Sequence, residues 1–281
     1  MDISAIHHAP IRALFLDIDG TIIADTDSVS PTVRDAIAAA RAVGCEVALC
    51  TGRARFTALP IAAQIPPPGY VITSNGGVIT HLGTGATIAR RLMDKSAARE
   101  VIQAIYAAGA QPYVYEDSPQ DGPEANRVLY HPSRPPGAWA VGPRYQPYDD
   151  LLETPPFDPV SVSAFGPEKV MRPLAIELRE RFGDSCSIIG VGTHRNWGVE
   201  VYTSGVSKQA GLETVAARLD VPREEIMAIG DHINDLEMIR WAGIGVAMQN
   251  AIPEIIEAAD YVTASVYEDG VARAIERFIL S

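Results

Sequence analysis

The segment Leu14-Phe15-Leu16-Asp17-Ile18-Asp19-Gly20-Thr21 decides how this chain folds. Its apolar start is typical of a buried strand, and that strand ends abruptly in two carboxylates, Asp17 and Asp19. Gly20 and Thr21 then turn the chain away. Alternate strand residues share a face, so both carboxylates can approach one site. Carboxylates held that close resist ionising together, which indicates a place where a cation or a reaction needs them. A buried strand followed by a plain Asp-Gly turn is the alternative interpretation.

Length and composition limit the classes of protein to which the chain can belong. Its 281 residues suggest two domains of roughly 150 residues each, and 47% apolar residues suffice for ordinary hydrophobic cores. The formal charge of -12, from 35 acidic and 23 basic residues, argues against a protein that coats nucleic acid or an anionic membrane. An anionic small molecule remains compatible, because one local cation-rich pocket can hold it.

The cysteines and the first residues predict a cytoplasmic protein. Cys45, Cys50 and Cys186 are an odd number, and the first two are separated by roughly 16 Å if their short strand is extended. We therefore expect reduced thiols. The opening Met1-Asp2-Ile3-Ser4 lacks the basic start and apolar core of a signal peptide. No apolar run reaches the length of a membrane span.

Strand and helix patterns alternate in both the first and the last third of the chain. This alternation predicts an α/β fold, a Rossmann-like parallel sheet with helices on its faces. The expected strands are Ala13–Leu16, Glu46–Cys50, Tyr70–Thr73, Trp197–Tyr202, Ile226–Gly230 and Ile244–Ala247. The first expected helix begins at Ser30-Pro31, where Ser is an N-cap and Pro the first helical residue. A second helical stretch follows Arg53 and ends at about Gln64, and further helices are expected at Ser207–Leu219, Ile233–Trp241 and Val271–Leu280.

Between these halves the pattern changes to a mixed α+β unit. A hairpin is expected at Val78–Thr80 and Thr87–Ala89, and residues Ser118–Pro159 are rich in proline and predicted to be loops. We therefore predict a core from residues 1–90 and 195–281, with residues 91–194 as an inserted domain. The insert should contain helices Ser96–Ala108 and Pro167–Phe182 and strands Gln111–Glu116, Arg127–His131, Val160–Phe165 and Ser185–Gly190.

Three of the predicted core strands end in polar residues. Leu16 is followed by Asp17, Cys50 by Thr51, and Gly230 by Asp231. In open parallel sheets the ligand crevice lies at the carboxyl ends of the strands. The three tips are therefore expected to converge on one site, although they are scattered along the sequence.

These tips carry a family resemblance. Asp-x-Asp-Gly-Thr after an apolar strand, Thr51 in Cys-Thr-Gly-Arg, Lys208 in Gly-Val-Ser-Lys-Gln-Ala-Gly-Leu, and the string Gly230–Met238 occur in the order of the four motifs of the haloacid dehalogenase (HAD) superfamily of phosphatases, which the chain resembles. Gly-Val-Ala-Met at Gly245–Met248 is similar to the Cof-type branch. Gln249 departs from that branch, which often has glycine there, and is expected to alter a loop beside the site without abolishing chemistry.

The resemblance implies a mechanism and its residues. Asp17 would attack phosphorus and form an aspartyl-phosphate. Asp19 would protonate the leaving oxygen and then activate the water that hydrolyses the intermediate. Lys208 would offer a positive charge to both Asp17 and the phosphate.

The resemblance also implies a Mg²⁺ ion, because Mg²⁺ favours oxygen ligands and offsets the repulsion between carboxylate and phosphate. Its protein ligands would be Asp17, Asp231 and the backbone carbonyl of Asp19. Asp235 would lie behind them, orienting metal waters or Lys208. Hydrogen bonds to the phosphoryl oxygens would come from Thr51, Asn234 and the backbone of Ile18 and Gly52.

The position of the insert, between Thr51 and Lys208, resembles the type-two (C2B) cap of the Cof-type branch. The resemblance thus implies a Mg²⁺-dependent phosphatase of small phosphorylated metabolites, such as sugar phosphates or phosphorylated cofactors, whose cap selects the substrate. We expect a monomer or small homo-oligomer with no nucleic-acid or membrane partner. Two alternatives stay open: a phosphomannomutase-like phosphotransferase, and a non-catalytic module that uses an Asp-Mg²⁺ pocket. Asp19 argues against the latter, since a mere phospho-acceptor needs no acid two residues on.

Other polar residues near these motifs have weaker signals. His232 is expected to point away from the metal, and no histidine pair shows metal-ligand spacing. Asn75-Gly76 is first of all a tight turn, although in the family this loop lines the cleft. His194 and Arg195 lie where the insert rejoins the core, and substrate contact there is left open.

Overall fold

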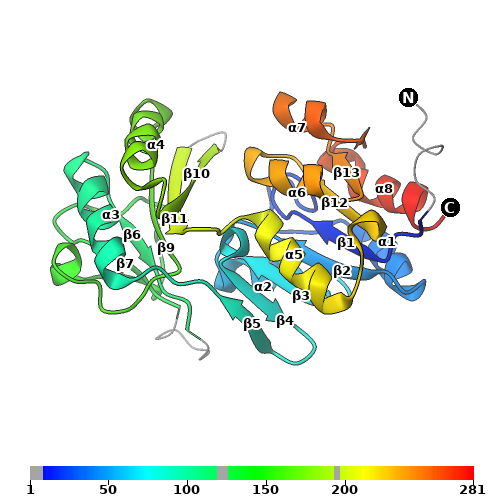
Figure 1. The fold of residues 1–281 in the computed structure, drawn as a ribbon, viewed down its shortest axis with the longest axis horizontal. Coiled ribbons are helices and arrows are strands. Elements are labelled where there is room, and N and C mark those ends of the chain that lie inside the picture. The colour runs from blue at the N-terminus through cyan, green and yellow to red at the C-terminus, as the bar shows by residue number, and fades with distance from the viewer. Residues whose placement is uncertain (1–8, 119–125, 193–196) are drawn as a thin grey trace. The chain divides into compact units, whose positions relative to one another are not determined.

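The computed structural model describes residues 9–118, 126–192 and 197–281 (Figure 1). The chain forms two compact units, one from residues 1–89 and 207–281 and the other from residues 90–206. The predicted end of the insert, residue 194, is therefore wrong, because the second unit continues to residue 206. His194 and Arg195 lie outside the described residues.

The first unit is built on an eight-stranded sheet with the order β14-β13-β12-β1-β2-β3-β4-β5. Neighbours from β14 to β3 are parallel, whereas β4 runs antiparallel to β3. This arrangement confirms the predicted α/β class. The strands are β1 (Ala13–Leu16), β2 (Glu46–Cys50), β3 (Tyr70–Thr73), β4 (Val78–His81), β5 (Ala86–Arg90), β12 (Ile226–Gly230), β13 (Ile244–Ala247) and the unpredicted edge strand β14 (Tyr261–Val262).

Helices cover both faces of this sheet because its strand residues alternate between two hydrophobic clusters. Leu14 and Leu16 of β1 belong to a cluster with residues of α1, α2 and α8, whereas Ala13 and Phe15 pack with α5 and α6. Asp17 follows Phe15 by two residues and so continues on the side of α5. The helices are α1 (Pro31–Ala42), α2 (Arg55–Ala62), α5 (Lys208–Leu219), α6 (Leu236–Trp241), α8 (Gly270–Phe278) and the unpredicted α7 (Pro253–Ala258).

Serine caps set the first residues of two of these helices. The Ser30 side chain accepts a hydrogen bond from the backbone N–H of Val33 at 3.1 Å, and Pro31 follows as the first helical residue. Ser207 accepts from the backbone N–H of Ala210 at 3.1 Å. Satisfying a backbone donor in this way stabilises a helix start. The second cap makes Lys208 the first residue of α5.

The second unit contains a six-stranded sheet with the order β10-β11-β9-β6-β7-β8. One face is covered by α3 (Lys95–Ala107) and α4 (Glu168–Phe182), whose apolar side chains form a cluster with residues such as Val199 and Val201. Glu200 lies between these two valines and therefore on the opposite face of the sheet. The strands are β6 (Tyr113–Tyr115), β7 (Val128–Tyr130), β8 (Tyr145–Pro147), β9 (Ser161–Gly166), β10 (Cys186–Gly192) and β11 (Trp197–Thr203).

Two predictions for this part of the chain are wrong. The strand at Trp197 was expected in the core sheet, but β11 pairs antiparallel with β10 and β9 in the second sheet. An apolar pattern indicates a strand but does not show with which strands it pairs. Because β11 was assigned to the wrong sheet, the predicted end of the insert came too early in the chain. The strand expected at Arg127–His131 is present as β7, but the predicted loop Ser118–Pro159 also contains β8, a strand of three residues that was not predicted. Strands that short are hard to recognise from periodicity.

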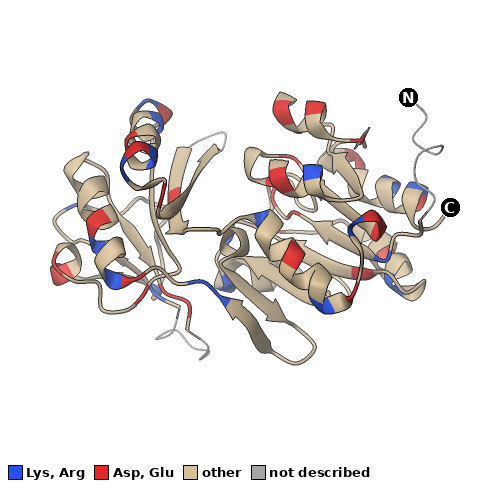
Figure 2. Ribbon diagram, in the orientation of Figure 1, with Lys and Arg blue, Asp and Glu red and all other residues tan. Residues whose placement is uncertain are grey.

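Charged residues of both signs are interspersed along the helices of both units (Figure 2). Within the described ranges, no helix combines the length and the apolarity that crossing a membrane requires.

Candidate active site

The three polar strand tips lie at one edge of the first sheet. β1 pairs in parallel with β12 on one side and with β2 on the other, so the carboxyl ends of the three strands are neighbours. The backbone N–H of Asp17 donates to Ile229 at 3.0 Å, and that of Thr51 donates to Ile72 at 2.9 Å, extending the ladders to the tips. Asp17, Thr51 and Asp231 therefore gather as their positions after the strands indicated.

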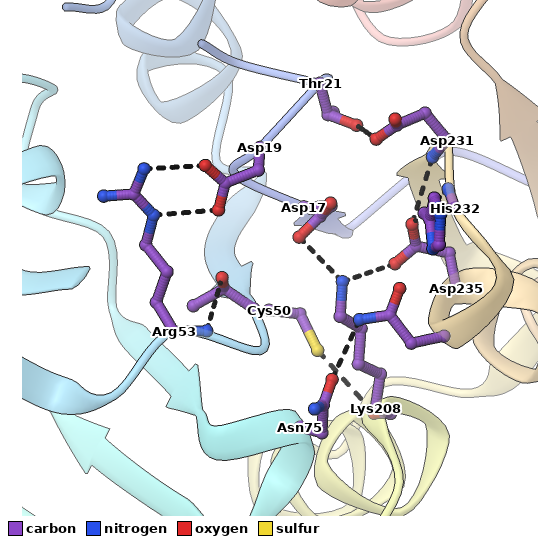
Figure 3. A network of polar contacts seen from close by, with 12 residues as sticks. Asp17, Asp19, Thr21, Cys50, Arg53, Asn75, Lys208, Asp231, His232 and Asp235 are labelled. Atoms are coloured by element: carbon purple, nitrogen blue, oxygen red, sulfur yellow. Dashed lines mark hydrogen bonds and ion pairs between the residues drawn. The ribbon is translucent and has the colours of Figure 1, made fainter. Parts of the chain in front are cut away.

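Lys208 connects two carboxylates at this edge (Figure 3). Its Nζ donates to Asp17 Oδ1 at 2.7 Å and to Asp235 Oδ1 at 2.6 Å. The lysine side chain is only 1% exposed, and those of its partners are 6% and 0% exposed. Because α5 covers the face toward which Asp17 continues, its first residue reaches the carboxylate directly. The buried lysine therefore ties the tip of β1 to the loop after β12.

Asp235 lies behind the strand tips and braces the loop after β12. Its Oδ2 accepts hydrogen bonds from the backbone N–H groups of Asp231 and His232, both at 3.0 Å, while Oδ1 accepts from Lys208. A Cβ on Gly230 would lie 2.5 Å from the Asp235 carboxyl carbon, so this close approach requires glycine. Asp235 thus contacts Lys208 directly, and its role in orienting Lys208 or metal waters stays a prediction.

Gly20 and Thr21 bring Asp231 close to the motif that contains Asp17. Gly20 has a φ of +79°, which favours glycine, and a Cβ there would lie 2.2 Å from Asp231 Oδ2. Thr21 donates its hydroxyl to Asp231 Oδ1 at 3.0 Å. In the loop after β13, Asn250 Nδ2 donates to the Gly20 carbonyl at 2.8 Å. The preceding residue, Gln249, is exposed and its side chain takes no part in this contact.

The electrostatics of this cluster favour a bound cation. Burial, followed by the charge of Asp235, raises the pKa of Asp17 well above its usual range, although Lys208 opposes the shift. Burial and Asp235 raise the pKa of Asp231 to about 7. Burial lowers the pKa of Lys208, but Asp17 and Asp235 outweigh this and raise it overall. One lysine therefore does not compensate three close carboxylates.

The same cluster has the donor atoms that Mg²⁺ prefers. One carboxylate oxygen from each of Asp17, Asp231 and Asp235 lies within 4.8 Å of the others. Hard oxygen ligands of this kind suit Mg²⁺. Asp235 already accepts from Lys208 and from two backbone N–H groups, so Asp17 and Asp231 are the better ligands of the three. The residues present fit the metal that the sequence predicted.

The side chain of Asp19 is directed toward Arg53 (Figure 3). Arg53 donates from Nε to Asp19 Oδ2 at 2.8 Å and from Nη2 to Asp19 Oδ1 at 2.6 Å. The same Nη2 donates to Asp27 Oδ1 at 2.8 Å. Arg53 was given no role from the sequence, although it stands directly after Gly52 in a predicted phosphate-binding motif. Bidentate ion pairs of this type are the strongest contacts between arginine and a carboxylate.

The predicted phosphate-binding groups lie in the loops at the sheet edge. The Thr51 hydroxyl oxygen accepts from the backbone N–H of Arg53 at 3.1 Å. Asn234 donates its Nδ2 to Asn75 Oδ1 at 2.9 Å, a contact that the sequence did not predict. The Ile18 carbonyl accepts from the backbone N–H groups of residues 21, 22 and 23, which turns the chain after β1.

His232 contacts this cluster through its main chain. Its backbone N–H donates to Asp235 Oδ2, and burial lowers the pKa of its imidazole ring. Among the described residues the imidazole is not part of the carboxylate group that could hold a metal. The expectation that it is no ligand stays a prediction.

A parallel sheet with a buried lysine and several carboxylates at its carboxyl edge can hold a cation and present a carboxylate nucleophile beside it. The haloacid dehalogenase-like hydrolase family matches residues 14–275 of this chain, and the chain belongs to that family. The resemblance stated from the four motifs is confirmed.

Relatives and solved structures match nearly the whole chain. YxeH from Bacillus subtilis is 31% identical over 288 residues, covering 96% of this chain and 99% of that protein. The 5-amino-6-(5-phospho-D-ribitylamino)uracil phosphatase YitU from the same organism is 26% identical, covering 94% and 96%. A HAD phosphatase from Bacteroides thetaiotaomicron is 26% identical with a TM-score of 0.77, covering 96% and 95%. A HAD subclass IIB sugar phosphatase, 23% identical with a TM-score of 0.73 and covering 95% and 98%, shares the fold.

Proposed function

We propose that this hydrolase is a Mg²⁺-dependent phosphatase that cleaves small phosphorylated metabolites through an aspartyl-phosphate on Asp17. The observation that carries the proposal is the buried Lys208, which bridges Asp17 and Asp235 beside Asp231 at the carboxyl edge of the sheet. A buried cation next to a carboxylate nucleophile compensates the charge of an incoming phosphate.

The chain's own residues account for both halves of the reaction. A carboxylate oxygen of Asp17 forms a bond to phosphorus while the bond to the leaving oxygen breaks, and Asp19 gives that oxygen a proton. Asp19 then takes a proton from water, whose oxygen attacks phosphorus. The bond to Asp17 breaks, and inorganic phosphate leaves. Lys208 holds Asp17 in place throughout.

Asp17, Asp231 and the main-chain carbonyl of Asp19 would hold the Mg²⁺ ion, which when bound reduces the repulsion between carboxylate and phosphate. Thr51, Asn234 and the backbone of Ile18 and Gly52 donate hydrogen bonds to the phosphoryl oxygens in this proposal. Their support is their position in the loops that follow β1, β2 and β12.

The ion pair with Arg53 adds a requirement to this mechanism. Both carboxylate oxygens of Asp19 accept from the Arg53 guanidinium. Each carboxylate oxygen keeps a second lone pair beyond the one that accepts from Arg53. The leaving group must therefore approach Asp19 from the side that the guanidinium leaves open, or one of these two hydrogen bonds must open first.

We further propose that the second unit acts as the cap that distinguishes leaving groups. The core motifs contain nothing that recognises the part of the substrate beyond its phosphate. Relatives are named as a 5-amino-6-(5-phospho-D-ribitylamino)uracil phosphatase, which is YitU, and as a phosphoglycolate phosphatase from Methanothermobacter thermautotrophicus. Sugar phosphates and phosphorylated cofactors are therefore the substrates to test first. A monomer or small homo-oligomer in the cytoplasm remains our expectation.

The test is the substitution Asp17→Asn, with Asp35→Asn on the exposed side of α1 as the matched control. Because an amide is a far poorer nucleophile, we expect phosphate release to fall by about three orders of magnitude or more, while the control retains activity. Acid quenching of the wild-type enzyme should trap a phosphorylated peptide that contains Asp17. Substantial activity in Asp17→Asn would refute the covalent mechanism. Phosphate release without a bisphosphate activator separates a phosphatase from a phosphomannomutase-like enzyme.

A further inference from the structure

The turn after β3 has an unusual backbone. Three consecutive residues have positive φ: Ser74 at 50°, Asn75 at 53° and Gly76 at 99°. Left-handed backbone is costly for residues with a side chain, and Asn is one of the few that tolerate it. Such outliers persist where the surrounding structure requires them, often at functional sites. Because the turn Ser74–Gly76 carries no charged side chain, the cause of its left-handed backbone is sought in its contacts with neighbouring segments.

Asn75 contacts the loops after two other strands. Its backbone N–H donates to the Thr51 carbonyl at 3.0 Å, and its Oδ1 accepts from Asn234 Nδ2 at 2.9 Å. A Cβ placed on Gly52 would lie 3.3 Å from both terminal atoms of the Asn75 side chain. The side chain is fully buried. Asn75 therefore joins the loop after β2 to the loop after β12 (Figure 3).

Gly76 extends this connection to the helix that carries Lys208. A Cβ at Gly76 would lie 2.2 Å from the Ser207 carbonyl oxygen, and Ser207 caps α5 directly before Lys208. A side chain at Gly76 would push the turn and the helix start apart. The turn after β3 thus packs against all the segments that supply the phosphate-binding groups except the loop after β1.

We propose that Asn75 is a positioning residue that holds the Asn234 amide ready for the phosphoryl group. The inference rests on the proposed phosphatase function and adds a residue to it. One N–H of the Asn234 amide is bound by Asn75, which fixes the plane of that amide and leaves its second N–H to donate to a phosphoryl oxygen. A donor fixed in advance loses no freedom when the anion binds.

The left-handed turn explains why this position is occupied by Asn. The backbone at residue 75 must be left-handed so that its N–H reaches the Thr51 carbonyl. Its side chain must also be short and end in an oxygen that accepts from Asn234. Glycine would satisfy only the first requirement and alanine would satisfy neither. This difference separates the conformational role of the residue from the role of its amide.

The experiment compares Asn75→Gly, which keeps the positive φ and deletes the amide, with Asn75→Ala, which also strains the backbone. The probe is inorganic phosphate, measured as a competitive inhibitor in the presence of Mg²⁺, and the Tm of each variant is recorded. We expect Asn75→Gly to raise the inhibition constant of phosphate up to about tenfold, the cost of ordering the Asn234 side chain on binding when it is no longer held in advance. Asn75→Ala should do the same and lower the Tm further.

A double-mutant cycle shows whether Asn75 acts through Asn234. Asn234→Ala should raise the inhibition constant by a similar factor, and adding Asn75→Gly to it should change the constant little further. If the double variant instead raised the inhibition constant by the product of the two single factors, the inference would be overturned, because Asn75 would then act independently of Asn234. A lowered Tm with an unchanged inhibition constant would also overturn it and leave a purely structural residue.

The failure of the proposed function gives a different result. Wild-type protein that neither releases phosphate from esters nor is inhibited by phosphate would overturn the phosphatase proposal, and the positioning role with it. Wild-type protein that is inhibited by phosphate, with both Asn75 variants unchanged, would overturn only the positioning role.

Discussion

Replacing Lys208 by Met tests whether the carboxylates at the strand tips depend on this one cation. The substitution keeps most of the length of the side chain and removes the ammonium group that donates to Asp17 at 2.7 Å and to Asp235 at 2.6 Å. Both partners are buried. Removing one partner of a buried ion pair costs about 3–5 kcal/mol, because an uncompensated charge stays behind. With two partners lost, we expect a decrease in the free energy of unfolding at the upper end of this range.

The size of this loss should depend on pH. Lys208 lowers the pKa of Asp17, which burial and Asp235 raise, so the variant should have an even higher pKa there. A carboxyl group whose pKa is raised in the folded state contributes stability that is present below its unfolded pKa and is lost as the pH rises through its folded pKa. The deficit of Lys208→Met should therefore be larger at about pH 7.5 than at about pH 5.5.

The measurement is urea unfolding in EDTA, followed by pulsed hydrogen exchange of the peptides that contain β1 and β12, so that the first unit is monitored separately from the second. Lys169→Met, at an exposed position of α4, is the control and should stay within about 0.5 kcal/mol of wild type. If Lys208→Met lost less than about 1 kcal/mol at the higher pH, or lost more at the lower pH, the electrostatic account of the site would be refuted.

The remaining predictions concern the metal and the cap. EDTA should remove phosphatase activity and Mg²⁺ should restore it, with Zn²⁺ a poor substitute for hard oxygen ligands; full activity after thorough metal stripping would contradict this. Because burial raises the pKa of Asp231 to about 7 and Mg²⁺ binds the deprotonated form, calorimetry should show Mg²⁺ affinity increasing as the pH rises through that value, and a flat profile would exclude Asp231 as a ligand. Glu200→Ala, on the face of the second sheet opposite α3 and α4, should change the relative kcat/KM of different phosphate esters without changing inhibition by inorganic phosphate; an unchanged ranking would remove Glu200 from substrate recognition.

The strand tips and the residues on them could be predicted from the amino-acid pattern alone. Asp17, Thr51 and Asp231 each follow a short apolar run, and the carboxyl ends of neighbouring parallel strands share one edge. The serine cap placed Lys208 at a helix start. These features depend on local periodicity and capping, which nearby residues dictate. The four motifs then identified the family, which the match over residues 14–275 confirms.

The contacts between side chains in the loops could not be predicted in this way, because they depend on how the packed sheet brings distant segments together. Arg53 pairs with Asp19 across 34 residues of sequence, and Asn234 with Asn75 across 159. The same holds for β11, whose apolar pattern fitted either sheet until its partners β9 and β10 were known. A strand or helix period fixes the direction of a side chain, but a loop has no period. The direction there follows from whichever distant donor or acceptor the packed sheet brings within reach.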